Sequence, residues 1–380
     1  MGSSLSGDEN AIASLSLSSS SVPPQVVRRR LSVLGGGDDP FMAAAGLSSD
    51  SLLDLFADED SKAAVYGMLE SSKQKYNTEK KHWTESTGNK SQAKENALDA
   101  LTLGWTCRKG LKPESPNQDD FFILRAGRTN ILGVLDGHGT LGHDVSNIMQ
   151  DVVPRTLVKH PAFKDKPAEA FVDAFEESQR ICAYVQKECK FDCSLSGTTA
   201  TVVVHRDGAL HVAHVGDSRA VLARAGKTKR FVSEDLTTDH GPNNEGEREM
   251  IESHGGEVRR LDGDAAHRVF VKGKMFPGLA MSRSLGDLVA HQVGVSSHPD
   301  TRSVQIADDW RFMLICSDGV WEFITSQEAV DLVGAYPPSE SQKAAEALAA
   351  EAWTRWLERE GNVVDDITVL LYWFNADRSQ

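Results

Sequence analysis

The chain has 380 residues, 40% of them hydrophobic, which is enough for one large catalytic domain with a tail or for two small domains. Its 55 acidic residues outnumber its 41 Lys and Arg residues, and the formal net charge of −14 argues against nucleic acid as a partner, because phosphate backbones attract concentrated positive charge. The first residues are polar and no apolar run approaches about 18 residues, so neither a secretory signal nor a transmembrane helix is expected.

Residues 1–50 are predicted to be a disordered tail, because their Ser- and Gly-rich composition cannot bury a core. The tail begins with MGSSLS, which fits the pattern for N-myristoylation of Gly2, although cloning tags can begin with the same four letters. One myristoyl chain binds a membrane only weakly, and the basic triplet Arg28–Arg30 would add a small electrostatic attraction. We therefore expect a cytoplasmic protein that associates reversibly with the cytoplasmic face of a membrane.

Residues 51–100 are predicted to be a charged, partly helical linker. Apolar side chains recur in it at helical spacing, first at Leu52, Leu53, Leu55 and Phe56 and then at Val65, Met68 and Leu69. A charged, polar stretch follows up to about residue 94.

Residues 101–376 have the pattern of one catalytic domain, and residues 377–380 are a short C-terminal tail. Apolar and β-branched runs predict strands at residues 131–135, 199–205, 210–215, 220–223, 312–316 and 367–373. Amphipathic segments predict helices at residues 142–159, 167–189, 245–254, 326–334 and 341–360. Because strands cluster with strands, and Gly208 and Gly226 mark hairpin turns, an α+β layered fold is favoured over a doubly wound parallel sheet.

The five cysteines fit no disulfide framework, so a reduced intracellular compartment is the expected setting. Three of them crowd together, at Cys182, Cys189 and Cys193. A zinc site there would need CxxC-like pairs and a fourth ligand, so we interpret them as ordinary thiols.

Aspartates recur at the ends of the predicted strands, next to glycines. Asp136, Asp217 and Asp318 each follow an apolar run, and Asp365 opens the last one. Acids that converge at one rim of a sheet repel one another, and a hard divalent cation stabilises them; oxygen ligands suit Mg²⁺ or Mn²⁺ better than zinc. Each Asp-Gly pair taken alone also fits a simple turn. The pattern therefore indicates a hard-metal site but does not name a substrate.

Nine segments in chain order resemble the metal-dependent protein serine/threonine phosphatases of the PPM or type 2C family, over residues 103–374. They are PNQDD (116–120), VLDGHG (134–139), SGTTA (196–200), HVGDSR (214–219), TDHG (238–241) with ER (247–248), HGG (254–256), LAMSRSLGD (279–287), CSDGVW (316–321) and DDITV (365–369). Each is weak alone, but nine in the family's order are very specific. The resemblance implies a central β-sandwich of two mostly antiparallel sheets flanked by α-helices, with a variable flap over about residues 241–277 that borders the active site.

The resemblance also implies a site with two Mg²⁺ or Mn²⁺ ions. Asp136 would bridge the two ions, and the Gly137 carbonyl would bind one of them. Asp318 and Asp365 would complete the protein ligands of the other ion, and Asp217 would help to hold a weaker third ion.

Further roles follow from the same resemblance. Gln118 and Asp119 would hold metal-bound waters, Glu322 would support the metal site, and His138 would be the general acid for the departing alkoxide. The implied reaction is direct hydrolysis of phosphoserine or phosphothreonine in protein substrates by water that two metals activate, without a phosphoenzyme.

Three other residues of the matching segments are expected to be structural. Asp287 is predicted to fix the turn after residues 285–286, and Arg219 and Arg283 are predicted to form internal ion pairs.

The sequence departs from the family at the phosphate-binding position. Many members carry an arginine three residues before the Asn117 position, where this chain has Glu114. Lys112 or Arg108 lies close enough in sequence to hold the substrate phosphate instead, although a lysine lacks the bidentate fork of an arginine. The usual acid at the Gln118 position is also missing, but an amide can still accept a hydrogen bond from a metal-bound water.

Two alternatives belong to other functional classes. One is a phosphatase-fold adaptor that binds phosphoproteins without turnover, and the other is a membrane-tethered scaffold in which the tail is the functional part. The intact set of Asp136, Asp318 and Asp365 favours the enzyme. We expect a monomer, because nothing in the sequence specifies an interface between copies.

Overall fold

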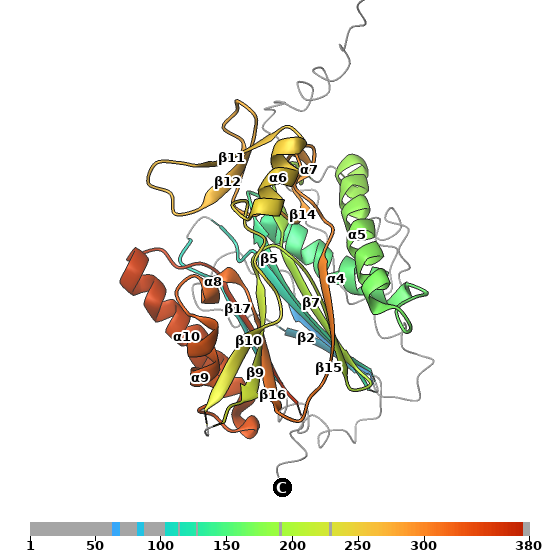
Figure 1. Cartoon of the computed structure of the whole chain (residues 1–380), viewed down its shortest axis with the longest axis vertical. Coiled ribbons are helices and arrows are strands. Elements are labelled where there is room, and N and C mark those ends of the chain that lie inside the picture. The colour runs from blue at the N-terminus through green and yellow to red at the C-terminus, as the bar shows by residue number, and fades with distance from the viewer. Residues whose placement is uncertain are drawn as a thin grey trace, which may run out of the picture. The chain divides into compact units, whose positions relative to one another are not determined.

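The computed structural model describes residues 63–68, 82–86 and 103–374, with gaps at residues 113–114, 127, 190–191 and 228–229; for the first two segments it describes the backbone alone. Two antiparallel sheets pack face to face in its centre, and helices cover their outer faces (Figure 1). The predicted α+β fold, with a central sandwich of two sheets flanked by helices, is confirmed.

The larger sheet has nine strands and follows the order β15-β8-β7-β5-β4-β1-β2, with the short strands β6 and β14 attached beside β5. Its strands are β1 (Ala63–Met68), β2 (His82–Ser86), β4 (Asp119–Ala126), β5 (Thr129–His138), β6 (Gly197–Thr198), β7 (Ala200–Arg206), β8 (Ala209–Val215), β14 (Leu285–Gly286) and β15 (Asp300–Gln305). β5 is buried along most of its length because helices cover one face and the second sheet covers the other. This explains its continuous apolar run, whereas the edge strand β15 is mostly exposed and polar.

The smaller sheet has five strands in the order β10-β9-β16-β17-β3. Its strands are β3 (Leu103–Arg108), β9 (Arg219–Ala225), β10 (Phe231–Asp235), β16 (Trp310–Cys316) and β17 (Ile367–Trp373). The two central strands, β16 and β17, are almost wholly buried. The core between the two sheets is built from side chains such as Phe121, Leu132, Val203, Met313 and Leu370.

Helices form a layer on each outer face of the sandwich. The larger sheet is covered by α4 (Gly142–Lys159) and α5 (Pro167–Cys189). The smaller sheet is covered by α8 (Asp318–Trp321), α9 (Ser326–Val333), the short 3-10 helix η3 (Pro338–Glu340) and α10 (Ser341–Glu360). α9 begins with a capping box between Thr325 and Glu328. The five helices predicted from the sequence are confirmed to within one residue at each end.

A separate small sheet is built mainly from the segment predicted to be the flap, residues 241–277, and extends two residues beyond it. It consists of β11 (Gly256–Arg260), β12 (His267–Val271) and β13 (Pro277–Leu279). With α6 (Glu245–Ser253) and α7 (Leu288–His291), this sheet encloses its own cluster of apolar side chains, which includes Ile251, Val269 and Val293. The flap therefore has a core of its own, at the upper end of the sandwich in Figure 1.

In the linker, residues 51–100, the structure differs from the secondary structure predicted from the sequence. Val65 and Met68 were predicted to be helical, but they lie in β1, which pairs with β4 on one side and with β2 on the other. The prediction of helix at these residues is wrong because backbone pairing with the edge of β4 outweighs a weak local periodicity. Residues 51–62 and the tail with Gly2 lie outside the described residues.

Among the described residues, no helix is both long enough and apolar enough to cross a membrane.

Candidate metal centre

Four aspartates from different elements come together at one end of the sandwich. Asp136 lies on β5, Asp217 follows β8, Asp318 begins α8 directly after β16, and Asp365 precedes β17. Each of the two sheets therefore supplies acids to this group, which we call the aspartate cluster. The carboxylate of Asp136 interacts electrostatically with the other three.

The acids of the aspartate cluster are buried and repel one another. Burial raises the pKa of Asp136 and the pKa of Asp318 well above the usual range, and the neighbouring carboxylates raise both further. Burial also raises the pKa of Asp217 to about 6. One oxygen of this side chain, Oδ1, is buried without a hydrogen-bond partner among the described residues. Carboxylates in this condition are stabilised by a divalent cation that prefers oxygen ligands, so the donor set fits Mg²⁺ or Mn²⁺.

Lys112 supplies positive charge at the edge of the aspartate cluster. Its ammonium group contacts the Asp365 carboxylate. Burial alone would lower the pKa of Lys112, but Asp365 and Asp366 raise it above the usual range, so the side chain is charged. Of the two residues that were predicted to hold a substrate phosphate, Lys112 is thus beside the metal-ligand candidates.

Arg108 lies in a different environment. Its guanidinium carbon stands 4.7 Å from the centre of the Trp353 ring on α10, and burial lowers the pKa of the side chain. This stacking occupies the face of the guanidinium. Arg108 is therefore the less suitable of the two candidates for the substrate phosphate, and Glu114 lies outside the described residues.

Two further aspartates hold the strands beside the cluster in place. Oδ2 of Asp119 accepts hydrogen bonds from the hydroxyls of Ser317 and Thr368, both at 2.7 Å, and burial raises the pKa of Asp119 to about 7. Asp366 accepts hydrogen bonds from the backbone N–H groups of Gly110 at 2.7 Å and Gln118 at 2.8 Å. In the sequence, Asp366 is visible only as the second acid of the segment DDITV (365–369). Since successive side chains of an extended chain point to opposite sides, such a pair can serve two sites.

The wall of the cluster is backbone rather than side chain. A Cβ atom on Gly137 would lie 2.4 Å from the Gly142 carbonyl oxygen, and one on Gly319 would lie 2.0 Å from the carbonyl oxygen of Asp366. Gln118 also fastens this loop, because its Nε2 donates to the Gly139 carbonyl at 2.6 Å. Only glycine permits such close approach.

Glu322 lies just after α8, where its backbone N–H donates to the Asp318 carbonyl at 2.9 Å. Its side chain lines a cavity of about 430 Å³ together with residues of α10 such as Arg355 and Glu358. Glu322 therefore follows Asp318 closely in sequence, and its side chain lines this cavity.

His138 ends β5, two residues after Asp136. Its Nε2 lies 2.6 Å from Oδ2 of Asp287, and both side chains are largely buried. Burial would lower the pKa of His138, but the Asp287 carboxylate more than offsets this and raises the pKa. The sequence did not predict this contact, because the two residues are 149 positions apart.

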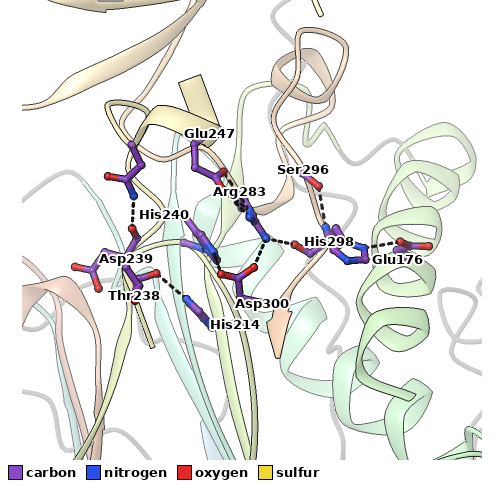
Figure 2. A network of polar contacts seen from close by, with 12 residues as sticks. Glu176, His214, Thr238, Asp239, His240, Glu247, Arg283, Ser296, His298 and Asp300 are labelled. Atoms are coloured by element: carbon purple, nitrogen blue, oxygen red, sulfur yellow. Dashed lines mark hydrogen bonds and ion pairs between the residues drawn. The ribbon is translucent and has the colours of Figure 1, made fainter. Parts of the chain in front are cut away.

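A second group of side chains with ligand atoms close together lies outside the aspartate cluster (Figure 2). The possible ligand atoms of His214, His240 and Asp300 lie within 4.8 Å of one another, and we call these three residues the histidine cluster. The two imidazole rings stack with centroids 4.3 Å apart. Nε2 of His240 faces Oδ2 of Asp300 at 3.4 Å.

Protein groups bind several polar atoms of the histidine cluster, although Nε2 of His240 is buried without a hydrogen-bond partner among the described residues. Nε2 of His214 lies 2.8 Å from the Thr238 carbonyl oxygen, and Nδ1 of His240 accepts a hydrogen bond from the Gly216 N–H at 3.2 Å. Asp300 accepts a hydrogen bond from Arg283 at 2.8 Å.

Arg283 and Arg219 both form internal ion pairs, as predicted. Arg283 binds Glu247 on α6 as well as Asp300, so it joins the flap to the larger sheet (Figure 2). Arg219 binds Asp239 at 2.6 Å.

Comparison with known proteins identifies relatives over this same region. A family model described as protein phosphatase 2C matches residues 108–358. The chain is 34% identical over 290 residues to a protein of Arabidopsis thaliana named probable protein phosphatase 2C 35, which covers 70% of this chain and 81% of that protein. It is also 34% identical over 273 residues to probable protein phosphatase 2C 48 of Oryza sativa subsp. japonica, covering 66% of this chain and 76% of the relative.

Two solved structures share the fold. A serine-threonine phosphatase 2C from Toxoplasma gondii aligns with a TM-score of 0.64 and 22% identity, over 72% of this chain and 94% of that chain. A sex determining protein of C. elegans aligns with a TM-score of 0.58 and 22% identity, over 71% of this chain and 64% of that chain.

Proposed function

The chain belongs to the protein phosphatase 2C family of metal-dependent serine/threonine protein phosphatases, and we propose that it hydrolyses phosphoserine and phosphothreonine in proteins with water that two divalent ions activate. The observation that supports this most is the aspartate cluster. Its buried carboxylates come from both sheets, and each raises the pKa of its neighbours because too little positive charge lies beside them. Asp136, the Gly137 carbonyl, Asp318 and Asp365 would hold two Mg²⁺ or Mn²⁺ ions, and Asp217 would hold a weaker third. When bound, such ions supply a nucleophilic water and stabilise the charge on the phosphoryl oxygens.

The residues around the cluster would bind the substrate phosphate, donate a proton to the leaving group and orient water. Lys112, charged and in contact with Asp365, would attract a phosphoryl group as a point charge. His138 would give a proton to the departing seryl or threonyl oxygen. Gln118 and Asp119 would orient waters through their fixed positions beside the cluster.

A direct mechanism without a phosphoenzyme also agrees with the cysteines. The cysteines whose side chains the structure describes are all buried, at Cys107, Cys182, Cys193 and Cys316. Burial raises the pKa of Cys316 and helps raise the pKa of Cys182, which disfavours the thiolate that a phosphocysteine mechanism needs.

The test is release of phosphate from a phosphothreonine peptide by the purified full chain, with Mn²⁺, with Mg²⁺ and with EDTA. We expect release with either metal, none with EDTA, and none from an Asp318→Ala variant under any of these conditions. Absence of turnover with every metal, while calorimetry still shows phosphopeptide binding, would overturn the proposal in favour of an adaptor.

Membrane attachment through Gly2 stays a prediction, because Gly2 lies outside the described residues. Labelled myristate should enter the wild-type chain in cells and should not enter a Gly2→Ala variant. If the variant fractionates with membranes as the wild type does, the prediction of a lipid-dependent location at the cytoplasmic face is wrong. The expected monomeric state can be checked on the same preparations by light scattering.

A further inference from the structure

The charges of the flap are divided between its helix and its sheet. Helix α6 carries four glutamates and one arginine, whereas the segment from β11 to β13, residues 256–279, carries five Lys and Arg residues and three acids. The chain as a whole has a formal net charge of −14. The small sheet of the flap is therefore a locally positive part of an acidic protein.

The loop between β12 and β13 presents part of this positive charge. Lys272, Gly273, Lys274 and Met275 are exposed, and we call these four residues the lysine loop. Met275 is 67% exposed, which is unusual for a large apolar side chain. Methionine is common at surfaces that bind other proteins, because its flexible side chain adapts to the partner.

Strand β11 holds the lysine loop in shape. Nη2 of Arg259 donates a hydrogen bond to the Lys274 carbonyl at 2.5 Å, and Oε2 of Glu257 accepts one from the Gly273 N–H at 3.2 Å. The guanidinium carbon of Arg259 in turn stands 4.4 Å from the centre of the Phe270 ring. The loop is thus fixed before a partner arrives, which lowers the entropy that is lost on binding.

The acids of the small sheet offset its arginines but not the lysines of the loop. Arg259 and Arg268 lie directly opposite each other in β11 and β12, where like charges repel. Arg259 pairs with Glu257, and Arg268 pairs with Asp264. Neither lysine of the loop forms an ion pair with any residue that the structure describes, so both ammonium groups are available to a partner.

The base of the flap is fastened beside the aspartate cluster. The His240 N–H donates to the Gly216 carbonyl at 3.0 Å, and the His240 carbonyl accepts from the Ser282 N–H at 2.9 Å. Gly216 directly precedes Asp217, whose carboxylate also interacts electrostatically with Asp239. The chain thus enters and leaves the flap next to an acid of the cluster. A protein substrate whose phosphorylated residue reaches the cluster therefore has its neighbouring segments close to the flap.

We propose that the lysine loop binds an acidic segment of the phosphoprotein substrate, with Lys272 and Lys274 facing its carboxylates and Met275 contacting an apolar side chain within it. This inference rests on the proposed phosphatase function and adds a substrate class, namely phosphoproteins that carry a run of Asp and Glu near the phosphorylated residue. The acidic remainder of the chain repels such a segment, so its attraction to the loop fixes where it lies.

The test compares phosphothreonine peptides as substrates of the purified full chain with Mn²⁺. One peptide is neutral, and the others carry the run Glu-Glu-Leu-Glu before or after the phosphothreonine at graded spacings. We expect kcat/KM of the preferred acidic peptide to exceed that of the neutral one about fivefold to tenfold, through a lower KM, because surface charges act on association. The advantage should shrink in about 0.5 M NaCl.

Variants of the loop should change this preference without changing the chemistry. Lys272→Glu combined with Lys274→Glu should raise KM for the preferred acidic peptide about tenfold, while kcat and the turnover of the neutral peptide and of p-nitrophenyl phosphate change less than about twofold. Arginine at both positions keeps the charge and should keep the preference. Met275→Gln should raise KM for the acidic peptide about twofold to threefold, because the contact with its leucine is lost.

The chain offers a matched control for the reversed charge. Lys164 and Lys227 are both exposed, Lys164 lies beside the last residue of β7, and Lys227 lies in the turn between β9 and β10. β7 and β9 begin close to Asp217, so these lysines lie at the opposite ends of the strands. Lys164→Glu combined with Lys227→Glu makes the same change in net charge and should leave the preference for the acidic peptide intact.

The outcomes separate the role of the loop from the proposed function. Equal kcat/KM for neutral and acidic peptides, or a preference that survives the reversed charge, would overturn the role of the loop. Unchanged peptide kinetics with loss of binding to phosphatidylserine vesicles in the same variant would assign the loop to a membrane surface and overturn it as well. A wild-type chain that hydrolyses no substrate would instead overturn the proposed function. Fluorescence anisotropy of a labelled acidic phosphopeptide would then still show whether the reversed charge weakens binding, as the loop requires.

Discussion

The aspartate cluster and the histidine cluster both bring possible metal ligands together, but they differ in how their charges are compensated. In the histidine cluster, Asp300 pairs with Arg283, and backbone groups bind a nitrogen of each imidazole. In the aspartate cluster, carboxylates face one another, and among the described residues the ammonium group of Lys112 forms an ion pair with one of them, Asp365. Closeness of ligand atoms is therefore a weaker indication of a metal site than repulsion that the protein leaves uncompensated.

The tautomer of His240 strengthens this contrast. Because Nδ1 of His240 accepts a hydrogen bond from Gly216, a neutral ring carries its proton on Nε2, which faces Asp300. A metal ion at Nε2 would have to displace that proton. In a neutral ring the proton would then sit on Nδ1, which could no longer accept the hydrogen bond from Gly216. The histidine cluster is better suited to joining the flap, through Arg283, to the larger sheet.

The largest expected effect comes from removing one acid of the aspartate cluster. Asp318→Asn should lower phosphate release from a phosphothreonine peptide by about 10³-fold or more, because an essential ligand for the activating ions is lost. Titration calorimetry should show weaker Mn²⁺ binding. His240→Gln, the matched change in the histidine cluster, should leave Mn²⁺ binding unchanged; loss of a tight site in this variant would contradict the distinction between the clusters.

The two clusters should also respond in opposite directions to pH when metal is removed. The raised pKa values of Asp217, about 6, and Asp119, about 7, mean that the folded state holds these protons more tightly than the unfolded state. In EDTA, their contribution to the free energy of unfolding is therefore complete below about pH 4 and is lost as the pH rises to about 7. Asp217→Asn should reduce the loss in the free energy of unfolding between pH 4 and pH 7 by an amount on the order of 2 kcal/mol. Denaturant titrations at the two pH values measure this difference.

Asp300 gives the opposite sign. Its contact with His240 and its ion pair with Arg283 lower its pKa below the usual range, so its stabilisation is present above about pH 4 and is lost at lower pH. Asp300→Asn should weaken the acid-side loss of stability and leave the change between pH 4 and pH 7 intact. A variant that instead alters the neutral range would show that the two clusters are coupled.

Arg283→Ala should have a moderate effect on stability. It leaves Glu247, which is largely buried, without its cation and disconnects α6 from β15. We expect a loss of about 1–2 kcal/mol in the free energy of unfolding, together with faster proteolysis within the flap. Arg248→Ala removes an exposed pair within α6 and should change stability by less than about 0.5 kcal/mol.

The smallest effect is expected for His214→Asn. The asparagine amide can still donate toward the Thr238 carbonyl, and burial already lowers the pKa of His214 to about 4, so a neutral side chain replaces a neutral one. Stability should fall by about 1 kcal/mol at most, and the number of Mn²⁺ ions bound, measured by calorimetry, should not change. A lower ion count would mean that the histidine cluster does bind metal.

The sequence predicts the structure best where the local apolar pattern agrees with the topology of the fold. The helices at residues 142–159 and 341–360 were expected from the spacing of their apolar residues, and the structure has them at those residues. The aspartates that follow apolar runs do meet at one rim, because antiparallel strands from both sheets end there.

What the sequence could not predict depends on contacts between distant segments. β4 has no clean alternation because both of its faces are buried, and β1 forms through pairing with its edge. The contact of His138 with Asp287 and the stacking of Arg108 on Trp353 join residues far apart in the chain. Such pairs leave no mark in local periodicity, so only the fold reveals them.

The backbone wall at Gly137 and Gly319 limits how this protein can be redesigned. Because main-chain atoms already fill the space around these glycines, no larger residue can be placed there to narrow, widen or line the centre. Changes in metal preference must therefore come from the carboxylates themselves or from altered strand spacing. Substrate choice is easier to change through the flap, because the flap has a separate core. Its surface side chains can be exchanged without moving the aspartates.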